Sequence, residues 1–418
     1  MKTRAVILAG GEGTRLGVLT AKRTKPAVTF AGKYRIIDFT LSNCVNSNIF
    51  DVMIIAQYRP HSLIEHLGAG GPWDLNRDFT GGIRIYTPFK ASTSGWFTGT
   101  ADAVQQNFTF VKQNNPETVL ILSGDHIYTM NYAAMAQFHM EKEADLTIAT
   151  IEVSKEDTSR FGIMQIDENQ RVTAFDEKPK YTNGTIANMG VYLFNTDVLN
   201  DILWEDHLDE NSSHDFGKDI LPKLIESNLK VYAFPYDGYW VDVGTINSYW
   251  QAHMDLLNHP PALNLYDRSW IIHTRTEERP PAFIENNAEV SNSLISDGCI
   301  IEDGAKVTHS ILSPGVRVKS NAIVRDAIVL TDGVINQGAI VERAILDKKV
   351  IISEKARVGS IIKNKLLISM VGKGSVIPDG ATIEAGAMIG TDVNPFDFSS
   401  NIIQSGEFLE TKRQPNEL

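Results

Sequence analysis

The stretch LAGGEGTRLGVLTAKRTK, residues 8–25, ends an apolar run that begins at Ala5. A strand followed by a glycine loop and a helix start presents backbone N–H groups to an anion, and glycines let the anion approach the backbone closely. Arg15 and Lys25 add cationic side chains within the same stretch. This pattern favours a polyphosphate site, but a tight turn after a buried strand explains an isolated glycine loop about as often.

Apolar runs of strand length recur through the first part of the chain, at residues 52–56, 119–122, 146–151 and 231–235. The segments between them have helix-like patterns, for example residues 101–114 and 132–142. Continuous apolar runs that alternate with helices predict an α/β fold with a doubly wound, mainly parallel sheet. Sites in such sheets lie at the carboxyl ends of strands, where the glycine loop and Asp125 both fall.

The C-terminal part of the chain carries an internal repeat. Its alanines recur in one phase and at one constant interval, at Ala288, Ala305, Ala322, Ala339 and Ala356. Apolar residues within each unit follow at steps of six, five and six, which is typical of a parallel β-helix with three short faces per turn. A proline-broken linker precedes the repeat, so the predicted domains are 1–258 and 282–418, joined by 259–281.

The composition narrows the classes of function. The 418 residues carry a formal net charge of −12, which argues against nucleic acid or an anionic membrane as the main partner. Cys44 and Cys299 form neither a disulfide framework nor a metal knuckle, and the N-terminus lacks a signal-peptide layout. We therefore expect a cytoplasmic protein that binds an anionic substrate through a local cluster of Lys and Arg.

Two aspartates follow apolar runs and can hold a divalent cation against phosphate oxygens. Asp125 stands in LILSGDH, and Asp242 stands in YWVDVGT. Carboxylates are hard oxygen ligands that suit Mg²⁺, and two of them can share one ion. A turn or helix-cap aspartate is the common alternative for each, and the sequence leaves open whether the two converge.

Two further strings have both a functional and a structural interpretation. Glu177 and Lys178 in FDEKP can clamp a sugar phosphate, with Glu177 accepting hydrogen bonds from hydroxyls and Lys178 neutralising the phosphate. An ordinary surface turn is the alternative. Gly99 and Thr100 in GTADA can admit a flat base beside the backbone, although simple N-capping by Thr100 is the favoured interpretation there.

Together these strings resemble the family of bacterial ADP-glucose pyrophosphorylases, also called glucose-1-phosphate adenylyltransferases. The matching strings reach from the start of the chain to about Tyr249 and are LAGGEGTRL, KPAV, GKYRIIDFTLSNCVNS, GTADAV, GDHIY, FDEKP, NMGVYLF, HDFGKDI and YWVDVGT. The repeat is similar to the family's C-terminal left-handed β-helix. The glycine loop, GTADAV, EKP and both aspartates are shared with sugar nucleotidyltransferases generally, whereas GKYRIIDF, NCVNS, GDHIY and HDFGKDI are more particular to this branch.

The resemblance implies that ATP and α-glucose 1-phosphate react with Mg²⁺ to give ADP-glucose and pyrophosphate, for glycogen or α-glucan synthesis. It implies direct in-line attack without a covalent enzyme intermediate, so that positioning and charge neutralisation provide the catalysis.

The resemblance also implies roles for individual residues. The catalytic set is Arg15, Lys25, Asp125 and Lys178. The nucleotide set is Gly10, Gly11, Gly13, Thr14, Arg15, Lys25, Gly99 and Thr100. The sugar-phosphate set is Phe97, Gly162, Glu177, Lys178 and Asn188, and the metal set is Asp125 and Asp242.

The chain departs from better-known members of the family. Arginine is frequent there at the positions of Glu12, Thr98 and Val241. Tyrosine is frequent at the position of Phe97, and serine at that of Asn188. These differences bear on the sugar and effector preferences more than on the reaction class. Two rival functions remain: another sugar-1-phosphate nucleotidyltransferase that uses UTP, dTTP or GTP, and a non-catalytic regulatory subunit. A regulatory subunit is expected to have lost members of the catalytic set, and all four are present.

Regulation and assembly are also implied by the resemblance. Lys33 and Arg35 match a family segment that helps to bind a phosphorylated glycolytic activator, although ordinary solvated charges are the more frequent interpretation of such a pair. We therefore expect a phosphorylated metabolite as effector. The regular faces of the β-helix can pair with another subunit, and the resemblance implies a homotetramer.

Overall fold

The structure, a computed structural model, describes residues 1–88 and 96–413. The chain forms two compact units whose segments alternate along the sequence. Unit 1 consists of Met1–Gly11, Ile37–Trp240 and Asp267–His273, and unit 2 consists of Glu12–Ile36, Val241–Tyr266 and Thr274–Leu418. The glycine loop therefore passes from unit 1 into unit 2 within its own length. The linear division into 1–258, 259–281 and 282–418 stays a prediction.

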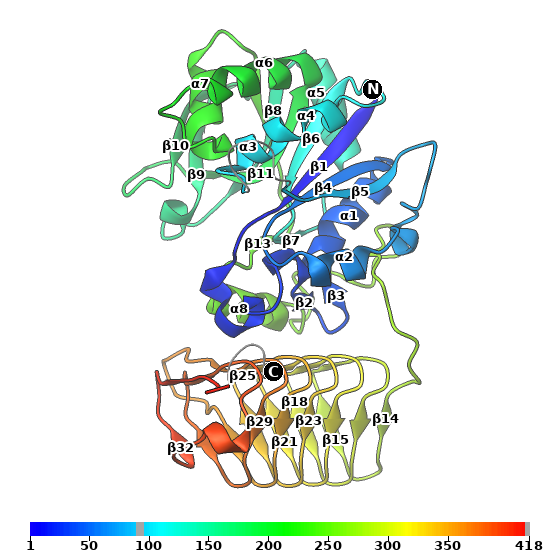
Figure 1. The fold of residues 1–418 in the computed structure, drawn as a ribbon, viewed down its shortest axis with the longest axis vertical. Coiled ribbons are helices and arrows are strands. Elements are labelled where there is room, and N and C mark those ends of the chain that lie inside the picture. The colour runs from blue at the N-terminus through cyan, green and yellow to red at the C-terminus, as the bar shows by residue number, and fades with distance from the viewer. Residues whose placement is uncertain (89–95, 414–418) are drawn as a thin grey trace. The chain divides into compact units, whose positions relative to one another are not determined.

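A nine-stranded sheet forms the centre of unit 1 (Figure 1). Its strands are β1 (Thr3–Ala9), β4 (Asp51–Ala56), β5 (Gly82–Tyr86), β6 (Thr118–Ser123), β8 (Leu146–Glu152), β9 (Gly162–Ile166), β10 (Val172–Glu177), β11 (Ile186–Asn195) and β12 (Val231–Pro235). The order along the main path is β10-β9-β11-β6-β1-β4-β5, and β8 and β12 continue from β11.

The predicted α/β class is confirmed, with a sheet that is mixed in direction. β6, β1, β4 and β5 pair in parallel, and so do β8 and β12. β11 runs antiparallel to β6, β8 and β9, so the sheet changes direction at this strand. Ala5, Val6, Ile7 and Ala9 of β1 are buried and cover both faces of the strand, as expected for a central parallel strand.

Helices cover this sheet. They are α1 (Ile36–Asn46), α2 (His61–Leu67), η3 (Gly71–Trp73), α3 (Thr100–Gln106), α4 (Phe108–Val111), α5 (Tyr132–Glu141), η4 (Thr158–Arg160), α6 (Thr196–His207), η5 (Phe216–Ile220) and α7 (Leu221–Glu226), with the short strand β7 (His126–Tyr128) between β6 and α5. Among the described residues, no helix combines the length and the apolar character needed to cross a membrane.

The helix expected over residues 101–114 is two shorter helices, α3 and α4. They are separated at Asn107, whose backbone leaves the helical region at φ −102° and ψ 9°. The side-chain amide of Asn107 donates to the carbonyl oxygen of Ala103 at 2.8 Å, so a local side-chain hydrogen bond competes with helix continuation.

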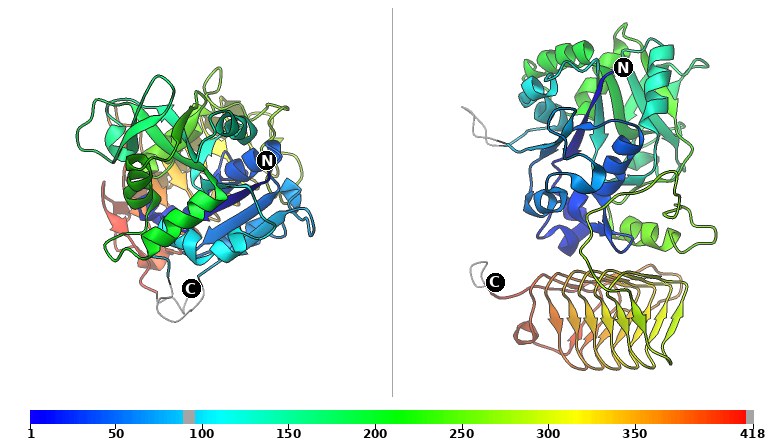
Figure 2. Two further views of the ribbon diagram at one scale, coloured as in Figure 1. Left: turned by 90° about the horizontal axis from the view of Figure 1, so that it is seen from above. Right: turned by 90° about the vertical axis from the view of Figure 1, so that its right-hand side faces the viewer.

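Unit 2 contains the predicted parallel β-helix, whose stacked coils are visible in Figure 2. Its first sheet is β14 (Phe283–Ile284), β17 (Ile300–Ile301), β20 (Arg317–Val318), β23 (Val334–Ile335), β26 (Ile351–Ile352) and β29 (Val376–Ile377). Its second is β15 (Glu289–Ser291), β18 (Lys306–Thr308), β21 (Ile323–Arg325), β24 (Ile340–Glu342), β27 (Arg357–Val358), β30 (Thr382–Ile383) and β32 (Ile402–Ile403). Its third is β16 (Leu294–Ile295), β19 (Ile311–Leu312), β22 (Ile328–Val329), β25 (Ala344–Leu346), β28 (Ser369–Val371), β31 (Met388–Ile389) and β33 (Phe408–Leu409). The short helix η6 (Pro395–Asp397) lies between β31 and β32.

The constant interval of the repeat sets the register of these coils. Ile284 pairs with Ile301, and Ile301 pairs with Val318, so each apolar residue lies above its counterpart one period later. The repeated alanines from Ala305 to Ala356 are fully buried in the core. One coil is longer than the others: Ile352 pairs with Ile377, because the chain between β27 and β28 carries an insertion. Three stacked parallel sheets are consistent with the expected left-handed β-helix.

The segment that follows the glycine loop packs against these coils within unit 2. It contains η1 (Thr14–Thr20), η2 (Lys25–Ala27), β2 (Thr29–Phe30) and β3 (Tyr34–Arg35), and α8 (Ile246–Asp255) lies in the same unit after β13 (Trp240–Asp242). Arg23 donates two hydrogen bonds to the carboxylate of Asp347, at 2.9 and 2.8 Å, and both side chains are buried. Trp250 donates to the carbonyl oxygen of Asp326 at 2.9 Å.

Candidate active site

The GTADA string is fixed in unit 1 by the segment around Asp215. Gly99, rather than Thr100, occupies the N-cap of α3, and no side chain caps this helix. The favoured interpretation of Thr100 as a simple cap was therefore wrong. Its hydroxyl donates to Asp215 Oδ2 at 3.0 Å and accepts from the N–H of Phe216 at 3.0 Å. A Cβ on Gly99 would clash with the carbonyl oxygen of His214, so only glycine allows this approach.

Glu177 ends β10 directly opposite Gly162 of β9. Lys178 follows with a left-handed φ of 49°, and its ammonium lies 3.0 Å from Glu177 Oε1. The Lys178 side chain is exposed, whereas that of Glu177 is largely covered. The carboxylate of Glu177 and the ammonium of Lys178 therefore lie side by side at the end of β10. Because its side chain is exposed, Lys178 can contact the phosphate group of a ligand.

The segment Asp215 to Gly217 connects the Glu177 region with the GTADA string. A Cβ on Gly217 would lie 2.9 Å from Glu177 Oε2, so the carboxylate rests against this glycine. Asp215 holds Thr100, as described above, and also accepts from the N–H of Gly217 at 2.9 Å. These residues lie in the family string HDFGKDI, but no sequence pattern predicted a role for Asp215 or Phe216.

Asn188 is hydrogen-bonded to Tyr192, whose side chain lies near Glu177 and Asp215. No sequence pattern predicted a role for Tyr192. The side-chain amide of Asn188 donates to the Tyr192 hydroxyl at 2.8 Å. Burial raises the pKa of Tyr192 well above its usual value, and the negative charges of Asp215 and Glu177 add to this effect. The Tyr192 hydroxyl is therefore a neutral hydrogen-bonding group beside the two carboxylates.

Phe97 is held by Gln57, which directly follows β4. The N–H of Phe97 donates to Gln57 Oε1 at 2.8 Å, and Gln57 Nε2 donates to the carbonyl oxygen of Phe97 at 3.4 Å. A Cβ on Gly10 would lie 3.6 Å from the Gln57 Cβ, so one residue adjoins both the glycine loop and Phe97. Gln57 carries no motif, and only the position directly after a parallel strand indicated it.

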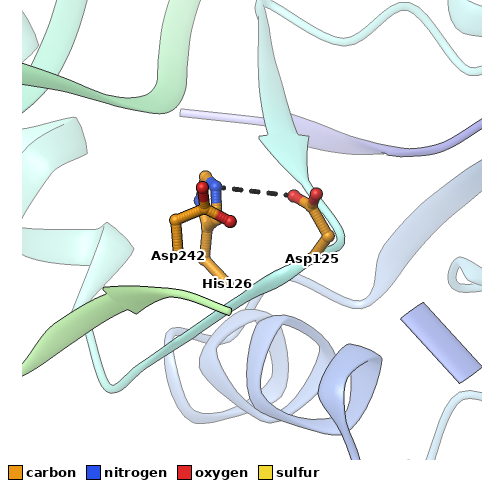
Figure 3. A group of neighbouring side chains, drawn as sticks. All are labelled: Asp125, His126 and Asp242. Atoms are coloured by element: carbon orange, nitrogen blue, oxygen red, sulfur yellow. Dashed lines mark ion pairs between the residues drawn. The ribbon is translucent and has the colours of Figure 1, made fainter. Parts of the chain in front are cut away.

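Asp125 lies two residues beyond β6, at the carboxyl end of a central strand. Ser123 donates a hydrogen bond from its hydroxyl to Asp125 Oδ1. His126 Nε2 lies 3.5 Å from the same carboxylate, as the dashed line in Figure 3 marks. The His126 ring contacts the ring of Trp240 edge to face, with centroids 5.0 Å apart.

The cationic residues of the opening stretch meet Asp242 in unit 2. Lys25 is buried, and its ammonium lies 2.7 Å from Asp242 Oδ1. A Cβ on Gly244 would lie 2.9 Å from a guanidinium nitrogen of Arg15 and 2.8 Å from Asp242 Oδ1, so Arg15 and Asp242 converge on this glycine with Lys25 beside them. Gly13, at φ 69°, packs against Lys25 and Thr20, a conformation that favours glycine.

The predicted effector residues adjoin a cationic region of the β-helix. Lys33 is exposed beside Tyr34, and Arg35 NH1 donates to the carbonyl oxygen of Ala27 at 3.3 Å. Burial lowers the pKa of Lys348 to about 7, and the positive charges of Arg35 and Arg23 contribute. The pKa of Lys373 is also lowered by burial and then by Arg23.

The predicted site residues thus form one group in each unit. In unit 1, Gly99, Thr100, Gly162 and Glu177 are connected through the segment from Asp215 to Gly217. In unit 2, Arg15, Lys25 and Asp242 lie around Gly244. Asp125 and Asp242 belong to different units, so a shared metal site is part of the proposal below.

Two family models match this chain and identify the class of protein to which it belongs. The sequence model of the nucleotidyl transferase family matches residues 4–259, and that of the GlmU-like C-terminal hexapeptide family matches residues 280–366. Enzymes of the first class transfer a nucleotidyl group.

Similar proteins extend the likeness over the whole chain. A glucose-1-phosphate adenylyltransferase of Thermotoga sp. (strain RQ2) is 50% identical over 421 residues, covering 99% of each chain. That of Thermosipho melanesiensis is 49% identical over 97% of this chain and 99% of its own. That of Clostridium acetobutylicum is 51% identical over 71% of this chain and 78% of its own. The chain belongs to the nucleotidyl transferase family and, within it, to the glucose-1-phosphate adenylyltransferases.

Proposed function

We propose that this chain transfers AMP from ATP to α-D-glucose 1-phosphate, giving ADP-glucose and pyrophosphate for glycogen or α-glucan synthesis. The observation that carries the proposal is the likeness, along 99% of both chains, to proteins named for this activity. The retention of Arg15, Lys25, Asp125 and Lys178 supports an active enzyme rather than a regulatory subunit.

In this proposal the glycine loop and the cations that follow it in the sequence bind the triphosphate. Gly10, Gly11, Gly13 and Thr14 offer backbone N–H groups, and Arg15 and Lys25 neutralise the phosphate oxygens as negative charge develops on the departing pyrophosphate. Arg15 and Lys25 both lie next to Asp242, beside Gly244. This closeness supports the proposal that the two cations bind the same anionic ligand. Gly99 and Thr100 adjoin the base in this proposal, at the start of α3.

The sugar phosphate binds at the ends of β9 and β10. Lys178 fixes the phosphate, and Glu177 accepts hydrogen bonds from the sugar hydroxyls. Phe97, Gly162 and Asn188 complete the sugar-phosphate set. The neutral hydroxyl of Tyr192, beside Glu177 and Asp215, supports a polar sugar-binding surface here. The sugar-phosphate oxygen then attacks the α-phosphorus of ATP, and positioning converts this encounter into a first-order step.

Asp125 and Asp242 provide the donors for Mg²⁺. Two carboxylates are the hard oxygen ligands that this ion prefers, so the residues present fit it. Asp125 follows β6 and Asp242 ends β13, so each carboxylate stands at the end of a strand. When bound, Mg²⁺ supplies charge neutralisation to the transferring phosphate.

A substrate screen tests the function. Pyrophosphate release is measured with ATP, UTP, dTTP and GTP, each with glucose 1-phosphate and with other sugar 1-phosphates. We expect the highest kcat/KM for ATP with glucose 1-phosphate. A preference for UTP, dTTP or GTP would make the chain another sugar nucleotidyltransferase, and no turnover with any pair would make it a regulatory subunit.

We further propose that a phosphorylated metabolite binds at Lys33 and Arg35 and regulates ATP use. The support is the concentration of positive charge there: Arg35 and Arg23 both lower the pKa of Lys348. A multivalent anion would relieve this repulsion. The test is an ATP saturation curve with and without a panel of phosphorylated metabolites, for the parent and for Lys33→Ala. Equal responses of the two proteins would remove Lys33 from the site.

For assembly and location, we propose a cytoplasmic homotetramer. The first strand of the β-helix, β14, leaves Phe283 and Ile284 60% and 45% exposed at the end of its sheet, which favours contact with another subunit. Cys44 and Cys299 are buried free thiols, which suits a reducing compartment. Sedimentation of the purified protein measures the number of subunits.

A further inference from the structure

The string LSNCVNS, residues 41–47, has no role in the proposed chemistry. It forms the second half of α1 and the residue that follows it. Thr40, Asn43 and Ser47 are spaced by three and four residues and therefore share one face of the helix. All three side chains are buried, and Asn43 is completely inaccessible to solvent.

This face of α1 holds the chain on both sides of Asp125. Thr40 donates to the carbonyl oxygen of Ser123 at 3.3 Å. Asn43 Nδ2 donates to the carbonyl oxygen of Tyr128 at 3.2 Å, and Asn43 Oδ1 accepts from the N–H of Met130 at 3.1 Å. Ser47 accepts from the N–H of Tyr132 at 2.8 Å, so the whole segment 123–132 is attached to one helix.

The same helix holds residues 267–273, the part of the linker region that belongs to unit 1. Asn43 Oδ1 also accepts from Trp270 Nε1 at 3.0 Å. Asn46 Nδ2 donates to the carbonyl oxygen of Ile271 at 3.0 Å, and Ser42 Oγ accepts from the N–H of His273 at 2.8 Å. Asn43 is the residue that contacts both the Asp125 segment and this linker segment through one side chain.

The chemistry of these contacts requires an asparagine. Its amide nitrogen donates to one carbonyl, and its oxygen accepts from a backbone N–H and an indole N–H. Aspartate has the same shape, but it has no donor for the Tyr128 carbonyl and places a charge in a buried position. Alanine leaves the polar groups of Tyr128, Met130 and Trp270 without this partner.

We propose that Asn43 is a positioning residue for Asp125. It fixes the backbone that follows Asp125 and joins it to the linker segment at Trp270, so that the Asp125 carboxylate is presented in one orientation. The inference rests on the proposed role of Asp125 as a metal ligand. It assigns Asn43 a function in the geometry of the metal site and no contact with substrate.

The test compares Asn43→Asp and Asn43→Ala with the matched control Asn46→Ala, which removes a side-chain bond to the linker segment from the same helix. Mn²⁺ binding is measured by titration, together with kcat, the KM for glucose 1-phosphate and the Mg²⁺ concentration for half-maximal activity. Direct partners of metal ligands typically contribute about 10- to 100-fold to metal affinity or activity. Asn43 acts on Asp125 through the backbone, so we expect losses up to that size for both Asn43 variants. The KM for glucose 1-phosphate and all properties of Asn46→Ala stay near the parent.

Hydrogen exchange of residues 123–132 provides a readout that does not depend on turnover. We expect faster exchange at Met130 in Asn43→Ala, which removes the acceptor of this N–H, and parent-like exchange in Asn46→Ala. If the Asn43 variants do not fold, Trp270→Phe replaces them, because it removes one bond to Asn43 and leaves the segment 123–132 unchanged in sequence. A smaller rise in the Mg²⁺ requirement is then expected.

Two results would overturn the inference: Mn²⁺ affinity and Mg²⁺ requirement unchanged in folded Asn43→Asp, or unchanged in Trp270→Phe when the Asn43 variants cannot be obtained. Asp125→Asn is assayed in parallel to separate this failure from a wrong metal assignment. An inactive Asp125→Asn beside a normal Asn43→Asp refutes the positioning role alone. A fully active Asp125→Asn removes the metal role of Asp125 and, with it, the inference.

Discussion

Lys178 has an exposed side chain whose ammonium lies next to Glu177, and its backbone N–H donates to the carbonyl oxygen of Phe161, a bond that an alanine keeps. We predict that Lys178→Ala raises the KM for glucose 1-phosphate and leaves the KM for ATP almost unchanged, because uniform binding is lost from one substrate. Initial rates with each substrate varied in turn measure the split. Lys180→Ala, two residues away on the same exposed segment, is the matched control. An increase confined to the KM for ATP would move Lys178 to the nucleotide pocket.

Asp125 and Asp242 differ in their immediate partners, and this difference can be tested. Asp242 is paired with Lys25 at 2.7 Å, whereas Asp125 is next to Ser123 and His126. We predict that Asp125→Asn and Asp242→Asn each lower kcat by orders of magnitude while the circular dichroism spectrum stays that of the parent, because charge neutralisation at the transferring phosphate is lost. Near-normal turnover of either variant would exclude that residue from the metal site.

Single residues could be predicted where a strand end or a glycine loop makes chemistry visible. Asp125 follows an apolar run, and Glu177 precedes a cation and a proline, so both stood out. Gln57, Tyr192 and Asp215 did not, because their roles come from side chains that they meet in space. Thr100 was assigned to the wrong contact for the same reason, since its partner Asp215 is far away in the sequence.

At the scale of elements, α8 is joined to the turn between β2 and β3 by a buried neutral histidine. His253 Nδ1 donates to the carbonyl oxygen of Tyr249 at 2.8 Å, and Nε2 accepts from the N–H of Ala31 at 3.1 Å. Burial lowers the pKa of His253 to about 4. Protonation would place a donor against the Ala31 N–H.

We therefore predict an acid-sensitive contribution to stability from His253. Its pKa is about 6.5 in an unfolded chain, so the unfolded state binds more protons between that value and the folded pKa of about 4. The contribution is complete above about pH 6.5 and is lost as the pH falls towards 4. Thermal unfolding of the parent and of His253→Gln across this range measures it, and the variant should show a flatter pH dependence. Parallel curves would show that the pKa of His253 is not lowered.

The predicted strands and the expected helix over residues 132–142, which is α5, were found, whereas β5, β9, β10 and β11 were missed. Apolar runs located β1, β4, β6 and β8, because a strand buried on both faces is apolar for most of its length. The apolar run 231–235 also located β12, although this strand alternates between buried and partly exposed residues. The constant interval between the repeated alanines predicted the β-helix register directly. The break between α3 and α4 depends on one Asn107 side chain, and the reversal of the sheet at β11 depends on non-local pairing. Neither has a local pattern that a sequence can display.

At the scale of the whole molecule, the Arg23–Asp347 pair holds the segment of the glycine loop onto the β-helix within unit 2. Both groups are buried and form two hydrogen bonds. We predict that Asp347→Ala destabilises the protein by about 3–5 kcal/mol, because Arg23 is left buried without its counter-charge. Chemical denaturation measures this change. The double variant Arg23→Met, Asp347→Leu should recover most of the loss, and failure to recover would mean that Asp347 acts through other contacts.

A chain that ends near residue 260 removes the same support altogether. We predict that this truncated protein aggregates or changes its oligomeric state and loses affinity for ATP, since Arg23 and the residues around Gly32 lose the surface on which they pack. Light scattering and ATP titration test both effects. A soluble truncated protein with unchanged oligomeric state and activity would contradict this account of unit 2.

The alternation of the two units along the chain has a consequence for protein engineering. Chimaeras between relatives are usually joined at the boundary suggested by linear sequence, which here is near residue 260. Such a crossover would combine Arg15, Arg23 and Lys25 from one parent with the β-helix of another. A functional exchange should instead transfer residues 12–36 and 241–266 together with the β-helix, so that three separated pieces of sequence are inherited as one block.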